Sequence, residues 1–224
     1  MAPRGLRTRL LRRASKAGLF LPDPLAERLV AYYELLAHWN RKINLTALED
    51  PDAAIDRLLL EPVLAAKQFP PDPRALIDIG SGGGSPAIPL KLAAPHVQLT
   101  MVEVKARKSA FLREAIRHLA LSDTRVENSR YEELLVRPEL HEAYGVLTLR
   151  AVRVEPRILA TLQAFVRPEG AVWLFRGATG PEAPSDLLPP LSWVSTVPLV
   201  EDLQSRLTIL RKADLGVGYF PRGT

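Results

Sequence analysis

The feature of this chain that most restricts its fold is an apolar segment that leads directly into a cluster of glycines. Residues 75–79 have the length and composition of a buried strand, and four of the next five residues are glycine. Ser85 and Pro86 follow, and we expect them to act as the N-cap and the first-turn proline of a helix. Glycines lose more conformational freedom on folding than other residues do. Four of them therefore indicate a tight turn whose backbone a ligand approaches closely, and a strand-to-helix turn without a ligand is the alternative.

Beyond residue 75, short apolar runs alternate with segments of helical spacing. We expect strands near residues 75–79, 98–102, 124–127, 145–149 and 171–175, and helices near residues 86–93, 106–120 and 155–166. Two later apolar runs, at residues 193–197 and 207–211, have no clear helix between them and are expected to pair antiparallel at the sheet edge. The alternation predicts an α/β fold of the Rossmann-like kind, with a parallel sheet and helices on both faces.

The region before residue 71 has a different pattern. Asp23 and Asp50 each offer an N-cap and are each followed by proline, with apolar residues at helical spacing behind them. We expect Pro62 to kink or end the second of these helices. The length of 224 residues favours one domain with an extension. We divide the chain into a basic N-terminal arm at residues 1–22, a helical extension at 23–70 and an α/β domain at 71–224.

The positive charge of the chain is concentrated at its N-terminus. The formal net charge is +5, and residues 1–22 contain six basic residues and no acidic one, which leaves 24 basic and 25 acidic residues in the remainder. The six are Arg4, Arg7, Arg9, Arg12, Arg13 and Lys16. A cationic arm on a near-neutral body suggests a polyanionic partner such as RNA, which is the interpretation we prefer. A mitochondrial transit peptide and a solvated terminus are the alternatives.

Several functional classes are disfavoured by what the sequence lacks. There is no cysteine, so disulfides, cysteine-ligated zinc and a thiol nucleophile are excluded. The four histidines are scattered without metal-ligand spacing, and we expect no metal site. No apolar run approaches the ~20 residues that span a bilayer, and the N-terminus lacks the apolar core of a secretion signal. We expect a cytoplasmic protein without a membrane partner, and a monomer.

Two acidic residues lie where a parallel sheet places its ligand. Asp78 stands at the end of the first predicted strand, and Glu103 ends the second, 23 residues after Gly80. An acid at that distance can accept both hydroxyls of a ribose. The dinucleotide pattern G-x-G-x-x-G is broken at its sixth position by Ser85, and no P-loop is present. A cationic methionyl amine, as in S-adenosylmethionine (AdoMet), matches an acid beside the loop better than a pyrophosphate does.

Longer motifs resemble those of the 16S ribosomal RNA guanine-N7 methyltransferases, also called glucose-inhibited division protein B. The similar segments are residues 38–46 (HWNRKINLT), 78–90, Arg107-Lys108 with Phe111-Leu112, residues 129–133 and residues 150–152, in the family's order. The resemblance covers roughly residues 20 to 212. It implies a class I AdoMet-dependent methyltransferase fold, with 16S rRNA or the small ribosomal subunit as the partner.

The resemblance also implies roles for individual residues. The loop residues Gly80, Gly82, Gly84 and Ser85, with Asp78, would bind the methionyl part of the cofactor, and Glu103 would hold its ribose. Tyr131 and Glu132 would border the adenine, largely through backbone groups. Arg150 occupies a cofactor and substrate position of the family and is our candidate catalytic residue.

The chain departs from the family pattern in three places. These are Ser85 to Ala87 after the glycine loop, Asp56-Arg57 with Glu61-Pro62 in the second helix, and Arg176-Gly177 after the fifth strand. They leave a different target base open. The other hypotheses are a methyltransferase for protein or small molecules, a non-catalytic RNA-binding module, and an NAD-dependent dehydrogenase. Arg107, Lys108, Arg113 and Arg117 would face RNA phosphates or simply form a solvated helix face.

Overall fold

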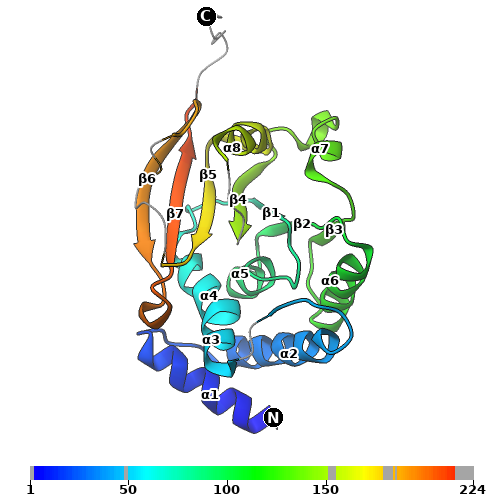
Figure 1. Ribbon diagram of the computed structural model, residues 1–224, viewed down its shortest axis with the longest axis vertical. Helices are drawn as coiled ribbons and strands as arrows, with labels where there is room; N and C mark the ends of the chain where they lie inside the picture. The colour runs from blue at the N-terminus through cyan, green and yellow to red at the C-terminus, as the bar shows by residue number, and fades with distance from the viewer. Residues whose placement is uncertain (1–2, 48–49, 151–154, 179–183, 185, 215–224) are drawn as a thin grey trace, which may run out of the picture.

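A seven-stranded sheet forms the centre of the protein (Figure 1). The computed structural model describes residues 3–47, 50–150, 155–178, 184 and 186–214. The strands are β1 (Ala75–Ile79), β2 (Gln98–Val102), β3 (Thr124–Glu127), β4 (Tyr144–Arg150), β5 (Val166–Arg176), β6 (Leu191–Pro198) and β7 (Arg206–Lys212), in the spatial order β3-β2-β1-β4-β5-β7-β6. The first five strands pair in parallel, and β7 pairs antiparallel with both β5 and β6. The predicted α/β fold with an antiparallel edge is confirmed.

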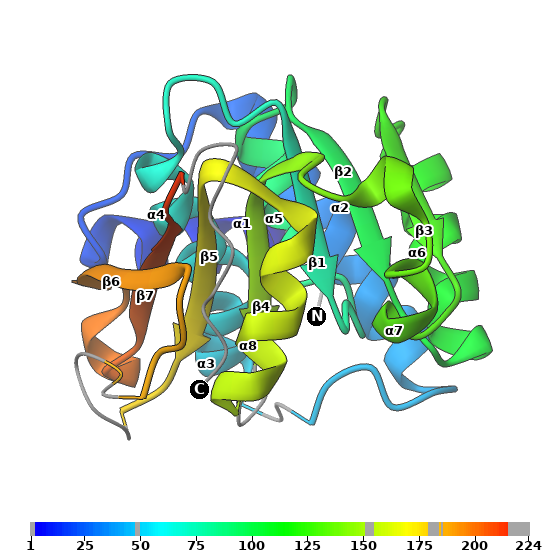
Figure 2. The same cartoon turned by 90° about the horizontal axis from the view of Figure 1, so that it is seen from above.

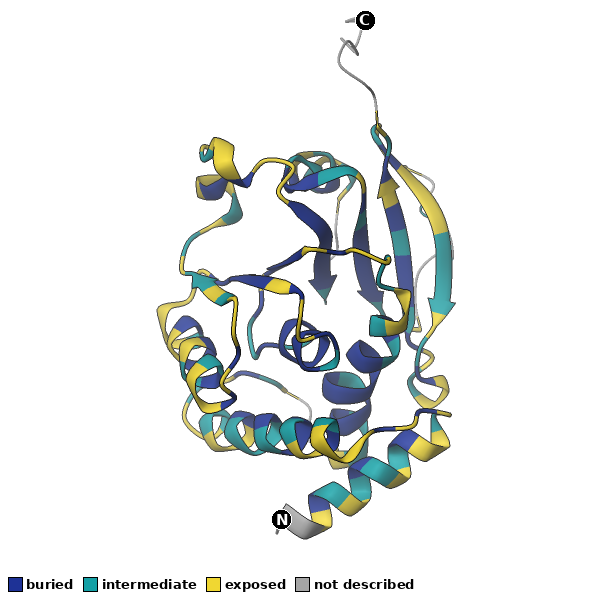
Figure 3. Cartoon of the chain, turned by 180° about the vertical axis from the view of Figure 1, so that it is seen from behind, coloured by how far each residue is buried: buried dark blue, intermediate teal, exposed yellow. Residues whose placement is uncertain are grey.

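Helices cover both faces of this sheet, and the strands are apolar on both sides. Leu76 belongs to one buried cluster and Ile77 to the other, because successive strand residues point to opposite faces. One face carries α2 (Asp23–Asn40), α3 (Pro51–Ile55), α4 (Glu61–Ala65), α5 (Ala87–Ala93) and α6 (Ala106–His118), and the other carries α7 (Tyr131–Leu134) and α8 (Pro156–Leu162) (Figure 2). Short 3₁₀ turns lie at Ala66–Gln68, Pro138–Leu140, Gln163–Phe165 and Glu201–Leu203. Figure 3 shows the central strands and α5 as the most completely buried elements.

The N-terminal segment, which we expected to be a basic arm that contacts RNA, forms a helix that packs on the body of the protein. Helix α1 (Pro3–Lys16) packs beside α2, and its residues Leu6, Leu10 and Ala14 are at most 3% exposed (Figure 1). Their spacing of four residues places them on one face of a helix. That face joins the same buried cluster as α2 and α5.

The basic side chains of α1 from Arg7 onward are paired with acids of the body. The ion pairs are Arg7 with Asp23, Arg9 and Arg12 with Asp52, Arg13 with Asp56 and Asp202, and Lys16 with Asp202. The pairs other than Arg13 with Asp56 are at least partly exposed, so each of those stabilises the fold by less than about 1 kcal/mol. Together, four aspartates nevertheless offset most of the charge of these five cations, which had suggested a polyanion-binding arm.

Of the two aspartates expected as helix N-caps, Asp50 and Asp23, only Asp50 has that role. Asp50 is an N-cap, and its side chain accepts a hydrogen bond from the Ala53 amide at 2.6 Å. Asp23 is not, because α2 begins at Asp23 itself and its carboxylate accepts from Arg7 instead. Pro62 does not end its helix either. A π-helical turn at Asp56–Leu60 precedes α4 and leaves Pro62 in the first turn of that helix, where its missing N–H is tolerated.

The three-part division of the chain at residues 22 and 70 stays a prediction. Helices from all three parts contribute to one buried cluster, with Leu10 from the first, Leu36 from the second and Ile88 from the third. In the described residues, no helix is both long and apolar enough to cross a membrane.

Candidate cofactor site

The glycine loop turns away from the sheet at the carboxyl end of β1. The amides of Gly80 and Ser81 both donate to the Val102 carbonyl of β2, at 2.9 and 3.0 Å. Gly80, Gly82 and Gly84 have φ angles of 76°, 53° and 86°, a backbone region that other residues rarely adopt. The predicted tight turn is therefore present, and its backbone favours glycine at these three positions.

The glycines differ in what lies beside them. A Cβ added at Gly80 would meet nothing within 4 Å, and one at Gly82 only the Gly80 carbonyl oxygen at 3.7 Å. These two positions leave the loop backbone open to a ligand. A Cβ at Gly84 would lie 2.5 Å from the Ile88 side chain, so Gly84 faces helix α5 instead. Gly84 thus allows close packing of the loop against the helix.

Glu103 joins the loop to the end of β2. Its side chain accepts hydrogen bonds from the Gly82 amide at Oε2 and from the Lys105 amide at Oε1, each at 2.8 Å. The residue is only 6% exposed. Each carboxylate oxygen has a second lone pair, so the group can still accept hydrogen bonds from a ligand's hydroxyls. The sequence placed Glu103 at this site, and the loop contact that orients it became visible only in the structure.

Asp78 lies beneath the loop with one oxygen unpaired. Its Oδ1 accepts from the Thr148 hydroxyl of β4 at 2.5 Å, whereas Oδ2 is buried and has no partner among the described residues. Burial raises the pKa of Asp78 above its usual value. A buried, unpartnered carboxylate oxygen is costly, and a ligand's ammonium group would relieve that cost.

Arg150 lies at the carboxyl end of β4 in a buried ion pair. Its Nη1 is 3.0 Å from Oε2 of Glu61 and donates to the Arg57 carbonyl at 2.5 Å. The guanidinium also lies over the Phe175 ring, 4.7 Å from the centroid. Burial lowers the pKa of Arg150, and burial raises that of Glu61 while Arg150 opposes the rise. Nε and Nη2 of Arg150 are buried without a partner among the described residues.

Ser85 does not have the capping role that we expected. Its hydroxyl donates to the Leu58 carbonyl at 2.8 Å, and α5 begins at Ala87 with Pro86 as its N-cap. The reason is that the loop packs against the π-helical turn, whose carbonyl at Leu58 is available to the serine. Ser85 therefore ties the glycine loop to the helical extension.

The end of β3 contributes residues that the sequence did not single out. Asn128 donates from Nδ2 to the carbonyls of Glu103 and Val104, at 2.9 and 3.1 Å, and so joins β3 to β2. Val104 is 51% exposed although it is apolar. Tyr131 and Glu132 begin helix α7, half-buried and exposed respectively. Within the described residues, neither side chain makes a hydrogen bond or an ion pair with the loop, so their place at the cofactor stays a prediction.

Two further polar contacts fix the loop from outside the predicted site. The hydroxyl of Tyr32 in α2 donates to the Gly83 carbonyl at 2.6 Å, and Tyr32 is fully buried. Thr148 holds Asp78, as described above. The sequence analysis singled out neither residue, because nothing in a helical or strand pattern reveals a long-range hydroxyl partner.

These groups fit AdoMet. The loop is open at Gly80 and Gly82, the orphaned oxygen of Asp78 suits an ammonium group, and Glu103 has lone pairs for hydroxyls. They meet where the strand order reverses between β1 and β4, which is where doubly wound sheets bind ligands.

The fold and the loop define the chain as a class I AdoMet-dependent methyltransferase. A crystal structure of a SAM-dependent methyltransferase from Aquifex aeolicus shares this fold, with a TM-score of 0.56 and 12% identity over 76% of this chain and 97% of that one. The family model described as rRNA small subunit methyltransferase G matches residues 25–183. The chain belongs to that family.

Curated relatives agree with this family over most of the chain. A protein named ribosomal RNA small subunit methyltransferase G from Xanthomonas axonopodis pv. citri is 39% identical over 184 residues, 82% of each chain. One of the same name from Acetivibrio thermocellus is 33% identical over 177 residues, which is 77% of this chain and 71% of the relative. The resemblance inferred from the motifs is confirmed.

Proposed function

We propose that this protein transfers the methyl group of AdoMet to N7 of a guanine in 16S ribosomal RNA. The observation that carries the proposal is the family match over residues 25–183, which includes the glycine loop and the acids at the ends of β1 and β2. The relatives' names refer to small-subunit ribosomal RNA. We further propose that it acts in the cytoplasm as a monomer, on the small subunit or its RNA, and without a metal ion.

The cofactor would lie across the carboxyl ends of β1, β2 and β3. The methionyl ammonium would face Asp78 and the open backbone of Gly80 and Gly82, because the orphaned carboxylate oxygen lies beneath that loop. The ribose hydroxyls would donate to Glu103. Ser85 would act by holding the loop against the helical extension.

The adenine would lie beside the end of β3. Tyr131 and Glu132 would border it, and the exposed apolar side chain of Val104 offers a face for the ring next to the ribose acid. Asn128 would act indirectly, since its two hydrogen bonds fix the backbone of residues 103 and 104.

The proposed reaction needs no proton transfer by the protein. Bound AdoMet supplies an electrophilic methyl group on its sulfonium. Guanine N7 has an in-plane lone pair and no proton, so no general base is needed. The protein's task is to place the base in line with the methyl group and to exclude water. A methylated N7 gives the ring a positive charge, which nearby carbonyl oxygens or a carboxylate would stabilise.

Arg150 acts in this proposal as a positioning residue. Its Nη1 is already bound by Glu61 and the Arg57 carbonyl, while Nε and Nη2 are free of partners in the described part of the chain. A substrate carbonyl or phosphate oxygen would satisfy these two donors. The Arg57 and Glu61 positions, where the chain departs from the family pattern, are therefore the ones that set the orientation of Arg150.

The test is methyl transfer to defined RNA. Purified protein is incubated with radiolabelled AdoMet and with small subunits or naked 16S RNA transcribed without modifications, and the Gly82→Val variant serves as the cofactor-site control. We expect incorporation of one methyl group per RNA, which maps to N7 of a single guanine by mass spectrometry. Incorporation at another atom would contradict the proposed chemistry, and methylation of proteins alone would contradict the RNA substrate.

A further inference from the structure

We propose that a basic groove between the loop after α2 and the start of α6 holds the phosphate backbone of the substrate RNA. The inference rests on the proposed function, and it places the RNA surface away from the N-terminal helix. The groove has a volume of about 480 Å³ and is lined by residues 42–44 and 105–108. Four of these seven residues are cationic and none is acidic.

The cations of this groove differ from those of α1 in having no counterion. Within the described residues, no ion pair involves Lys42, Lys105, Arg107 or Lys108, and the first three are exposed. Every α1 cation whose side chain is described is paired with an aspartate. A phosphate gains more from a cation that has no acid beside it, because binding then displaces only mobile counterions. Four positive charges without a described ion pair therefore lie together in the groove.

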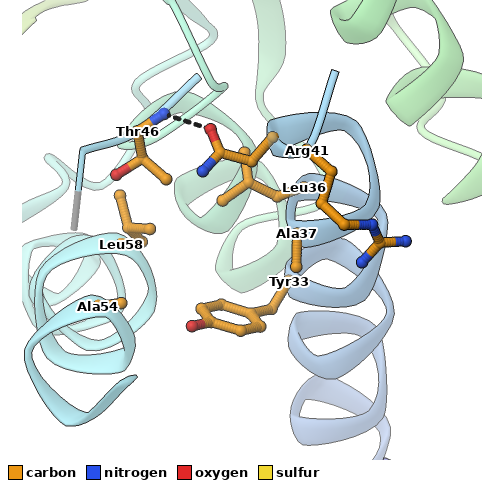
Figure 4. Close-up of a pocket in the computed structure, with 8 residues that line it drawn as sticks. Tyr33, Leu36, Ala37, Arg41, Thr46, Ala54 and Leu58 are labelled. Carbon is orange, nitrogen blue, oxygen red and sulfur yellow. Dashed lines mark hydrogen bonds between the residues drawn. The ribbon is translucent and has the colours of Figure 1, made fainter. Parts of the chain in front are cut away.

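Hydrogen bonds fix the backbone on both sides of the groove. The Asn40 side chain accepts from the amides of Leu45 and Thr46, at 2.8 and 2.9 Å, which fixes the loop that carries Lys42. Figure 4 shows the Thr46 hydrogen bond beside a cavity of about 180 Å³ between α2 and α3. On the other side, the Lys105 amide donates to Glu103. The cations thus extend from fixed positions, and preorganised sites lose less entropy on binding.

The groove is also adjacent to the candidate cofactor site. Lys105 follows Glu103 by two residues and is bonded to its carboxylate, the same group that binds the glycine-loop amide. An RNA strand whose phosphates lie over residues 105–108 passes the carboxyl end of β2, where AdoMet would be held. The groove is therefore suited to place a nucleotide at that edge of the sheet, and phosphate contacts fix register without reading sequence.

The experiment compares two triple variants of equal charge change in the full-length protein. The groove variant is Lys42→Gln, Arg107→Gln and Lys108→Gln. The matched control is Arg7→Gln, Arg12→Gln and Lys16→Gln, which removes three cations that are already paired with aspartates. A third variant, Lys42→Arg, Arg107→Lys and Lys108→Arg, keeps the groove charge. Affinity for unmodified 16S RNA is measured at several salt concentrations, and AdoMet affinity by calorimetry.

We expect the groove variant to lose about ten- to hundred-fold in RNA affinity near 0.1 M salt, with a slope of log affinity against log salt that is shallower by about 2. The matched control and the charge-preserving variant should behave as wild type, and AdoMet affinity should be unchanged in all three. An unchanged slope in the groove variant, or an equal loss in the matched control, would overturn the proposal. A parallel loss of AdoMet affinity would assign the groove to the cofactor and likewise overturn it.

The outcome for the proposed function is read separately, from methyl transfer by the wild-type protein. If wild-type protein transfers no methyl group to 16S RNA and the groove variant still loses salt-dependent RNA binding, the reaction assignment fails and the groove assignment stands. If methyl transfer occurs and the three variants bind RNA alike, the reaction assignment stands and the groove assignment fails.

Discussion

Leu10→Ala tests whether α1 is part of the folded body or an arm for RNA. Leu10 is fully buried and lies between Leu6 and Ala14 on the packed face of the helix. Leucine-to-alanine changes at such positions cost about 2–5 kcal/mol, from lost burial and the cavity left behind. Because α1 is terminal and can shift into the space, we expect about 3 kcal/mol. At about 2–4 °C per kcal/mol for a chain of this size, Tm should fall by about 6–12 °C.

The assay is thermal and urea unfolding of wild type, Leu10→Ala and the matched surface variant Arg12→Gln. Arg12 is 66% exposed and pairs with Asp52, so its loss should cost less than about 1 kcal/mol. AdoMet affinity of the folded Leu10→Ala protein should be close to that of wild type, because the described cofactor-site groups lie beyond α1.

One combination of results would contradict a helix α1 that is packed on the body. If Leu10→Ala left the unfolding transition unchanged while Arg12→Gln reduced RNA affinity and its salt dependence, the helix would be loosely attached and its cations available to RNA. In solution, α1 would then not be packed on the body with its cations paired to aspartates.

Three further predictions concern the candidate site. Gly82→Val should abolish AdoMet binding in calorimetry while the far-UV spectrum persists, because the branched side chain fills the open face of the loop at a φ of 53°; normal affinity would remove the loop from the site. Burial raises the pKa of Asp78, so the unfolded chain releases this proton near pH 4 and the folded chain only at a higher pH. As pH rises between these two pKa values, ionisation of Asp78 therefore lowers the free energy of unfolding, while AdoMet affinity rises. Asp78→Asn should flatten the dependence of AdoMet affinity on pH. An unchanged pH dependence in that variant would exclude Asp78 as the amine partner. Arg150→Ala should reduce kcat by more than tenfold and also lower Tm, since it leaves Glu61 buried without its partner. Arg150→Lys should restore Tm but not kcat. Recovery of both Tm and kcat in Arg150→Lys would make the residue purely structural.

The sheet could be predicted from the sequence almost residue by residue. The strands β1, β2 and β3 begin and end where expected, because each is a short apolar run bounded by residues that favour turns. The ends of β5 were less accurate. It begins at Val166, five residues before the expected start, since its irregular first half contains Pro168 and Gly170 and reads as a loop.

The polar contacts of the site could not be predicted in the same way. Glu103 was found because the spacing from the loop to the second strand end is a local property of the α/β unit. The partner of Arg150, by contrast, is Glu61, and the partner of the Gly83 carbonyl is Tyr32. These pairs are separated by dozens of residues, and only the packing of the helical extension against the sheet brings them together.

The N-terminal helix shows most clearly why charge must be located in space before it is interpreted. Along the sequence, the excess of basic residues lies entirely within residues 1–22, and that excess suggested a polyanion-binding arm. In the fold, aspartates from four separate positions meet the described cations of α1. Lys42 and Arg107, by contrast, come together from distant segments in a groove that no acidic residue lines. The attraction that a surface exerts on RNA depends on the charge that remains unpaired. The excess of basic residues can therefore lie at the N-terminus while the proposed RNA-binding surface lies elsewhere, in the groove of residues 42–44 and 105–108 next to Glu103.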